Sequence, residues 1–402
     1  MRRWIIAALL LVGGFAFACA ELVGVHDLSC GSEGGSPDPC GDGYVPPPPC
    51  VPDGGPFDTC VGDGGITILL TNGEVHGVAW ADGMVVAVGY DAMDSGTGLS
   101  IRALSKTGDV VDTIIEDAGM ANAVAVDQTL NSVWVAGGDG TSFIVRYFKV
   151  GPLKLDQSGN FAIAKDTQTP LRESVAIVPG GEQTVFGTST TDNLVIERLD
   201  DKAGHVHDIV YNNASIAVRA TSGVTSTAGM TILGDTPDAA LGLAMARFLP
   251  GPVKDPSFGD AGALVAKFGG GGSARSLLNA SDGVSYWVGG VAAGDGGFVL
   301  AHVTEAGVLD QSWTVAHAQS GANAMLAVDG GLLAAGFADG NLAIARFTLD
   351  AGIDTTFGDA GVLEIPMPGE LKAIVQTDTR YVAGGFAMIN GTKRWVLVWL
   401  IP

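Results

Sequence analysis

The residues that could do chemistry in this chain are scattered, and few of them form a pattern. Of the six histidines, His205 and His207 are the closest pair. In a β-strand the two would share a face and could bind a metal ion, but the sequence suggests no third ligand near them. Two exposed strand histidines are therefore the favoured interpretation. The HExxH, GxSxG and phosphate-loop motifs are also missing, so we predict no metal, cofactor or catalytic residue.

A basic residue recurs at one position of a repeated hexapeptide. The residues at this position are Arg198, Arg247, His302 and Arg346. An arginine that repeats in this way typically pairs with a neighbouring acid, such as an aspartate in the next turn. We expect this structural pairing rather than ligand binding.

Aspartates recur at turns of the same repeat, as Asp82, Asp127, Asp282, Asp329 and Asp378. They could ring one mouth of a channel and attract Ca²⁺ or a cationic ligand. Aspartate is also a favoured turn residue, and the turn role is the expected one. An enzyme would gather His, Tyr, Arg and acids at one mouth, and Tyr90, Asp139 and Asp235 are only weak candidates for such a group.

The first eighteen residues are typical of a signal peptide. A short basic region, Met1 to Arg3, precedes an apolar run from Trp4 to Phe17, and small residues at Ala16 and Ala18 suit a signal peptidase. The run is shorter than the roughly 20 apolar residues of a membrane span. We therefore predict residues 1–18 to be a signal peptide of an exported protein.

Cys19 directly follows the expected cleavage point. The segment ending in Ala18-Cys19 resembles the lipobox of bacterial lipoproteins, although Ala16 replaces the usual leucine and Phe17 is bulky. The resemblance implies that Cys19 is the lipid attachment site and that the protein is anchored to the cell envelope, at the outer membrane. The alternative is ordinary cleavage nearby, which would leave a free thiol on a secreted protein.

Residues 19–60 are predicted to be a stalk rich in Cys, Gly and Pro. The remaining cysteines, Cys30, Cys40, Cys50 and Cys60, are spaced by ten residues, and an even set in an exported chain indicates two disulfides. Three pairings are possible, and the spacing does not choose among them. A metal site is the less favoured alternative, since the CxxC spacing is missing.

The composition limits the partners. The chain has 402 residues, 60 of them glycine, and a formal net charge of -22. Such a charge repels phosphate backbones and keeps a glycine-rich β-protein soluble, so we expect no nucleic acid partner, and contact with the membrane through the lipid anchor alone. A monomer is expected.

An internal repeat covers the body of the chain. Its hexapeptides have apolar first, third and sixth residues in every copy, and they begin at residues 99, 143, 194, 243, 298, 342 and 395. Six intervals between residues 99 and 395 give a mean period of about 49 residues. Strands that are apolar on both faces are buried on both faces. The hexapeptides are therefore predicted to be the middle strands of stacked sheets.

Two further series precede each hexapeptide. One consists of short apolar runs that end in a glycine, at Gly89, Gly138, Gly187, Gly234, Gly290, Gly336 and Gly385. An earlier series of runs is separated from it by turn signals such as Asp82-Gly83 and Asp329-Gly330. With a weaker fourth strand after the hexapeptide, each unit has four strands, which favours a propeller. A β-solenoid is the alternative fold.

The repeat predicts an all-β fold: a single seven-bladed β-propeller over residues 61–402. The last unit lacks a fourth strand, while residues 61–70 copy the fourth-strand pattern that begins at Phe357. We predict that residues 66–70 pair with residues 395–400, so that the N-terminal strand closes the last blade and removes exposed sheet edges.

Two of the units resemble the delta-60 repeat found in secreted and surface proteins of bacteria. The resemblance rests on the segment from Asn341 through Asp354-Thr-Thr-Phe-Gly-Asp-Ala-Gly-Val and on the similar segment from Leu243 to Ala263. It implies a propeller-like domain and no substrate, cofactor or catalytic residue.

These features predict a surface-tethered, non-enzymatic binding or scaffold propeller with an unknown protein or glycan ligand. The alternative function is an extracellular polysaccharide hydrolase or lyase on the same fold, which would rest on fold analogy.

Overall fold

The structure is a computed structural model of the chain. It describes residues 57, 61, 64–94, 96–128, 131–139, 143–151, 154–163, 171–178, 183–189, 194–199, 205–211, 219–226, 229–235, 241–249, 253–315, 319–350 and 352–402. The predicted signal peptide, the predicted lipid attachment at Cys19 and the four cysteines predicted to form disulfides lie outside these residues. No helix among the described residues is long and apolar enough to span a membrane.

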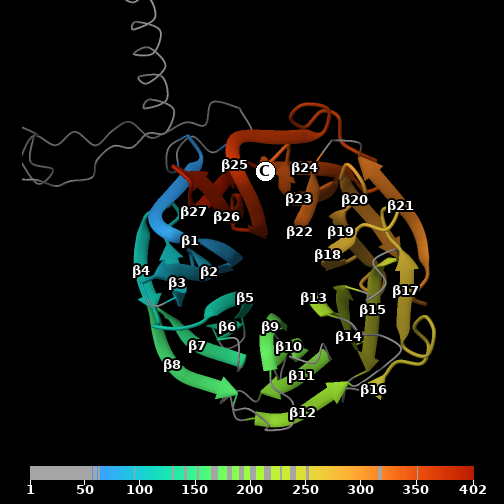
Figure 1. Ribbon diagram of the computed structural model, residues 1–402, viewed down its shortest axis with the longest axis horizontal. Helices are drawn as coiled ribbons and strands as arrows, with labels where there is room; N and C mark the ends of the chain where they lie inside the picture. The colour runs from blue at the N-terminus through green and yellow to red at the C-terminus, as the bar shows by residue number, and fades with distance from the viewer. Residues whose placement is uncertain are drawn as a thin grey trace, which may run out of the picture.

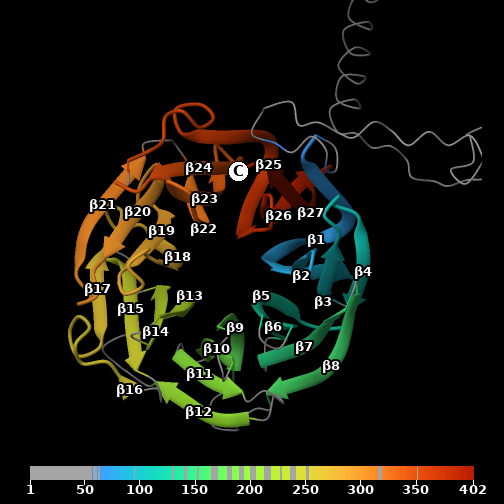
Figure 2. The ribbon, with the colours of Figure 1, turned by 180° about the vertical axis from the view of Figure 1, so that it is seen from behind.

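The described chain is all-β, and its strands are arranged around a common axis in a propeller-like ring (Figure 1). The innermost strands are β1 (Ile66–Ala81), β5 (Met120–Asp127), β9 (Leu171–Val178), β13 (Arg219–Ser226), β18 (Ser273–Asn279), β22 (Gly321–Val328) and β25 (Val362–Gln376). Each lies beside the next around the axis, and β25 lies beside β1. The view from behind shows the same order (Figure 2).

The strands paired directly with the innermost ones are β2 (Met84–Met93), β6 (Ser132–Gly138), β10 (Gln183–Ser189), β14 (Gly229–Asp235), β19 (Tyr286–Val291), β23 (Gly331–Ala338) and β26 (Tyr381–Ile389). Next come β3 (Gly96–Leu104), β7 (Phe143–Gly151), β11 (Leu194–Leu199), β15 (Gly242–Leu249), β20 (Phe298–Val303), β24 (Asn341–Thr348) and β27 (Thr392–Leu400). Every predicted hexapeptide falls within this third set.

The outermost strands are β4 (Val110–Ile115), β8 (Lys154–Ile163), β12 (His205–Tyr211), β16 (Val253–Lys254), β17 (Ala263–Lys267) and β21 (Leu309–Val315). Four of the five sheet paths follow chain order or its reverse: β5 to β8, β12 to β9, β13 to β16 with β17 on β15, and β18 to β21. The fifth path runs from β22 through β27 to β1 and on to β4.

Two long strands change partner along this fifth path. β25 pairs with β24 up to Pro368 and with β26 from Gly369 onward. β1 pairs with β27 between Ile66 and Asn72, and with β2 from Gly73 onward. The register Ile66↔Val398 to Leu69↔Trp395 confirms the pairing predicted for the N-terminal strand. In addition, Phe57 forms an isolated bridge with Leu400.

The glycine series is explained by a β-bulge on the innermost strands. At each bulge one extra residue is inserted in the inner strand, for example His76 in β1. The glycine of the second strand pairs with the residue that precedes the inserted one, as Gly89 pairs with Val75. A Cβ on Gly89 would lie 1.9 Å from the Glu74 carbonyl oxygen, and one on Gly385 would lie 1.9 Å from that of Glu370. In the unit of β6 this glycine is Gly137. The apolar run predicted to end at Gly138 is strand β6, which does end there, and the glycine at the bulge is the residue before it.

The core lies between neighbouring sheets. One cluster, for example, joins Val86 and Val88 of β2 with Val133 and Val135 of β6, all fully buried. Burying each such side chain contributes roughly 1.5–3 kcal/mol. The run Gly269–Gly272 connects β17 to β18 as an ordered turn. The amides of Gly271 and Gly272 both donate to the Phe268 carbonyl, at 2.8 and 2.7 Å.

Candidate functional site on the leading face

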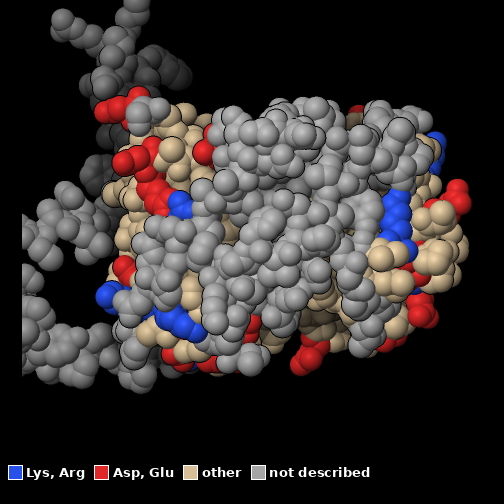
Figure 3. All heavy atoms as spheres, turned by 90° about the horizontal axis from the view of Figure 1, so that it is seen from below, with Lys and Arg blue, Asp and Glu red and all other residues tan. Residues whose placement is uncertain are grey.

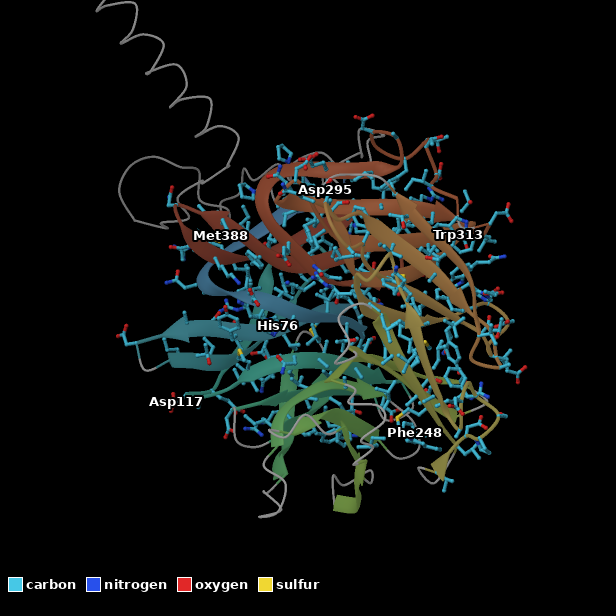
Figure 4. All side chains as sticks on the ribbon, turned by 45° about the vertical axis from the view of Figure 1, so that its right-hand side comes forward. His76, Asp117, Phe248, Asp295, Trp313 and Met388 are labelled. Atoms are coloured by element: carbon cyan, nitrogen blue, oxygen red, sulfur yellow. The ribbon has the colours of Figure 1, made fainter. Side chains whose placement is uncertain are left out.

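The candidate site lies at the β-bulges of the innermost strands, close to where each begins to pair with the second strand of its unit, and we call this side of the molecule the leading face. Because a bulge leaves one residue without a partner in the ladder, it re-aims that side chain. At the bulges of the described inner strands these residues are mostly polar: His76, Asn122, Thr221, Arg275, Asn323 and Lys372. In Figure 4, His76 lies toward the middle of the molecule, whereas Met388 and Trp313 lie nearer its margins.

One chain of hydrogen bonds runs across β18, β22 and β25. Arg275 Nη1 donates to Asn323 Oδ1 at 2.6 Å. Asn323 Nδ2 donates to the Leu371 carbonyl at 2.8 Å and to Glu370 Oε2 at 3.4 Å. Lys372 Nζ donates to the same Glu370 oxygen. The contacts of Asn323 with Arg275, Glu370 and Leu371 connect residues nearly fifty positions apart in sequence, so they depend on the repeat.

A second chain runs across β27, β1 and β5. Lys393 Nζ donates to Glu74 Oε2 at 2.5 Å, and His76 Nε2 lies 2.7 Å from Glu74 Oε1. His76 Nδ1 lies 3.1 Å from Asn122 Oδ1. The Phe386 ring links the two chains, since Lys393 Nζ and Lys372 Nζ lie 4.1 and 5.8 Å from its centroid. We call the whole set the polar arc: Arg275, Asn323, Glu370, Lys372, Lys393, Glu74, His76 and Asn122.

Two charges of the polar arc, those of Glu74 and Lys393, are stabilised in their ionised forms. Burial raises the pKa of Glu74, but hydrogen bonds from His76 and Lys393 outweigh it and hold this pKa at about 2. Burial lowers the pKa of Lys393, yet its contact with Glu74 outweighs that effect and raises the pKa. Tyr90, whose ring stacks edge-on against His76 at 5.6 Å, has its pKa raised by burial and by the Glu74 charge.

The recurring basic residues pair with acids, as predicted, wherever the structure describes them. Arg247 contacts Asp255 at 2.8 Å, His302 contacts Asp310 at 2.8 Å, and Arg346 contacts Asp354 at 3.5 Å. Each acid lies eight residues after its partner. The Arg247 guanidinium also lies 4.8 Å from the Phe258 ring centroid. In this unit the delta-60-like segment therefore forms a turn fixed by an ion pair and a buried ring.

In the His302 unit the basic residue contacts a serine as well as an aspartate, an arrangement that resembles a catalytic triad. His302 Nε2 lies 3.0 Å from Ser285 Oγ, and its Nδ1 contacts Asp310, which is the order of a hydrolytic triad. However, the Ser285 hydroxyl donates to Asp282 Oδ2 at 2.7 Å, and Ser285 is 4% exposed. The hydroxyl proton is directed at the Asp282 carboxylate instead of at His302, and the Ser285 oxygen is buried, so this group is structural.

Among the turn aspartates, Asp282 has the predicted turn role, whereas the Asp378 carboxylate contacts side chains far away in the sequence. Asp282 Oδ1 accepts from the amides of Val284 and Ser285, both at 2.9 Å, and these bonds lower its pKa. Asp378 accepts from Lys106 and Trp80. Within the described part of the chain, no group of three or more His, Cys, Asp or Glu could hold a metal ion.

The remaining sequence candidates do not form a site together. Tyr90 lies beside the polar arc, Asp139 is exposed after β6, and residue 235 ends β14. Residues 205 and 207 lie on the outermost strand β12, far from the inner strands in the sheet order, and the structure describes nothing of their side chains. On the side drawn in Figure 3, basic side chains lie in small groups among acidic ones.

The polar arc was not predicted from the sequence. The available signal was a polar residue at the same place in successive inner strands, such as Asn122, Arg275 and Asn323 in otherwise apolar runs. That signal is weak in sequence, because the polar residue varies from copy to copy and the sequence does not show the bulge that re-aims it.

Comparisons with known proteins identify the fold. No protein-family model matches the sequence, and no curated protein sequence matches it. Solved structures do match. Chaetomium thermophilum Sqt1 is 12% identical with a TM-score of 0.54, over 83% of this chain and 96% of that one. The β-propeller domain of Myceliophteria thermophila Cps50 (Swd1) is 11% identical with a TM-score of 0.53, over 83% and 98%. The polysaccharide lyase Uly1 is 11% identical with a TM-score of 0.52, over 88% and 94%. At such identities the likeness shows a propeller-like fold alone.

Proposed function

We propose that this protein is an exported binding or scaffold propeller, anchored to the outer membrane of the cell envelope through a lipid on Cys19. A disulfide-bearing stalk over residues 19–60 holds it away from the membrane, and its partner is a protein or a glycan. The observation that carries the binding role is the polar arc. It presents donors and acceptors from several neighbouring strands on one face of the molecule, as binding surfaces on propellers require.

We propose further that the ring has seven blades and is built from delta-60 repeats. Support for seven blades comes from the two long strands that change their pairing partner, β25 from β24 to β26 and β1 from β27 to β2. We place a boundary between blades at each of these two changes. The N-terminal strand then supplies the outermost strand of the last blade. The shared spacing of the Arg247 and Arg346 units, in each of which the paired aspartate lies eight residues later, supports the repeat.

Binding is favoured over catalysis by the direction of the pKa shifts. A general acid or base needs a pKa near the working pH. In the polar arc the shifts run away from neutrality, since the pKa of Glu74 is lowered to about 2 and that of Lys393 is raised. The pKa of neighbouring Tyr90 is raised as well. The alternative, a polysaccharide hydrolase or lyase, has as support a propeller-like lyase among the similar structures.

A binding experiment tests the proposal. The mature protein would be screened against extracellular proteins and glycans, and any partner would be measured again with Lys372→Glu. This change reverses a charge next to Glu370 and should weaken binding at least tenfold. Lys106→Glu is the matched control, because Lys106 also pairs with an acid but does so at 2.9 Å on an exposed surface outside the arc. Equal loss in both variants would count against the polar arc as the contact surface.

A further inference from the structure

A groove of about 500 Å³ opens beside the polar arc, where β1 leaves β27 and joins β2. Its lining includes Leu70 and Thr71 of β1, Asp91 and Met93 of β2, Ile115 of β4 and Arg394 of β27. Successive strand residues point to opposite faces. Asp91 and Arg394 therefore face away from Tyr90 and Lys393, and the groove is separate from the arc.

The change of strand partner creates the groove. The β1–β27 register runs to Leu69 and resumes at Asn72, and the β1–β2 register begins at Gly73. Leu70 and Thr71 thus have no partner in either ladder. The carbonyl of Leu70 accepts a hydrogen bond from Arg394 Nη1. The Leu70 side chain is 73% exposed, so an apolar surface stands at the rim.

Two residues that line the groove, Asp91 and Thr71, carry buried polar atoms without a hydrogen-bond partner. Asp91 Oδ2 accepts from Arg102 Nη2 and Ser100 Oγ, at 2.5 and 3.3 Å, but the buried Asp91 Oδ1 accepts from nothing. The Thr71 hydroxyl and Arg102 Nε are also buried without partners. The Asp91 side chain is 9% exposed. An unmade hydrogen bond of this kind is costly, so these atoms call for a group that both donates and accepts.

The charges around these atoms select the kind of group. Arg102 already compensates the Asp91 carboxylate, and Arg394 adds a positive charge at the rim, which disfavours a cationic ligand. A neutral hydroxyl fits, because it can donate to Asp91 Oδ1 while it accepts from Thr71. Three exposed apolar side chains, Leu70, Met93 and Ile115, can cover the C–H face of a ring that carries such hydroxyls. The volume lies within the range of about 300–1,000 Å³ of small-molecule sites.

We propose that this groove binds a neutral saccharide. Its hydroxyls reach the buried atoms of Asp91 and Thr71 when the Leu70–Thr71 segment, which has no partner in either ladder, shifts aside. The site does not depend on the polar arc, and it stands if the arc has no partner.

The test uses the mature protein and defined probes: maltotriose, cellotriose, xylotriose and mannotriose, with trigalacturonate and spermidine as anionic and cationic probes. Binding is measured by titration calorimetry and saturation-transfer NMR. At least one neutral trisaccharide should bind with one-to-one stoichiometry. Thr71→Val keeps the shape, removes the hydroxyl and should weaken that binding about fivefold.

Stability separates this role from a structural one. Because Thr71→Val removes a buried hydroxyl without a partner, the melting temperature of the ligand-free variant should not fall. The matched control Thr113→Val changes an exposed threonine of β4 and should leave affinity unchanged. Lys372→Glu in the polar arc should also leave it unchanged, which distinguishes this site from the proposed function.

Three results would overturn the proposal. The first is that no neutral trisaccharide binds, which would assign the unpartnered atoms to buried water alone. The second is saccharide binding that Thr71→Val leaves intact. The third is preferential binding of spermidine or trigalacturonate.

Discussion

Replacing Glu74 with glutamine should expose how much the polar arc contributes to stability. Hydrogen bonds from His76 and Lys393 hold the pKa of Glu74 at about 2, against an ordinary value of 4.5. At about 1.4 kcal/mol per pKa unit, this shift corresponds to roughly 3 kcal/mol. The Glu74 side chain is 12% exposed, so solvent screens little of it. We expect Glu74→Gln to lower the free energy of unfolding by about 2–3 kcal/mol at pH 7.

The sign of the pH dependence follows from the lowered pKa. The folded state prefers the ionised carboxylate, so the contribution is fully present above pH 4.5 and is lost as the pH falls toward 2. Urea denaturation of the wild type and of Glu74→Gln between pH 7 and pH 2 measures the difference. Other carboxylates titrate in both proteins and cancel. Glu364→Gln, at an exposed position of β25, is the control and should change stability by less than about 0.5 kcal/mol.

A gap between wild type and Glu74→Gln that stays the same from pH 7 to pH 2 would refute this reasoning. So would a gap at pH 7 no larger than that of the Glu364→Gln control. Either result would mean that the contacts of Glu74 with His76 and Lys393 do not stabilise its ionised form.

Three further predictions concern the repeat and the anchor. Arg247→Met leaves Asp255 buried without its cation and should cost about 3–5 kcal/mol in urea denaturation, whereas Arg346→Met, at a side chain 36% exposed, should cost less than about 1 kcal/mol; equal costs would contradict the burial argument. Gly385→Ala places a Cβ 1.9 Å from the Glu370 carbonyl oxygen and should destabilise by about 1–3 kcal/mol, and an unchanged melting temperature would show that the bulge can relax. Cys19→Ser should move the protein from the membrane to the soluble fraction on immunoblots, and retention in the membrane would argue against a lipid on this residue.

The sequence was sufficient for the repeating elements, because burial on both faces leaves a strong apolar pattern. The hexapeptide 298–303 is a strand with five of its six residues buried. The pairing of Arg247 with a neighbouring acid was predicted from its recurrence, and the structure identifies that acid as Asp255. The pairing of residues 66–69 with 395–398 was also predictable, since an incomplete last unit and a leftover first strand complement each other.

The polar arc was not predictable for a geometric reason. Glu74 and Lys393 are 319 residues apart, and they meet because β1 crosses from the last sheet to the first. The sequence indicates the strands on either side of this crossing, but it does not show that they form one continuous strand. The sequence likewise does not show which residue is inserted at each bulge. The one sequence signal for His76 is Gly89, which pairs with the preceding residue, Val75.

The most direct test of the account is whether the two ends of the propeller-like domain are joined side by side. Ile68 and Val396 are direct partners in the β1–β27 register. Directly opposed residues of antiparallel strands have Cα atoms about 4.5–5.5 Å apart, which suits a disulfide. In the mature protein carrying Ile68→Cys and Val396→Cys, non-reducing peptide mapping by mass spectrometry should find these two residues linked. Unlinked thiols at both positions, or an equal yield of disulfide in Ile68→Cys with Ala387→Cys, would contradict the pairing on which the polar arc and the groove both depend.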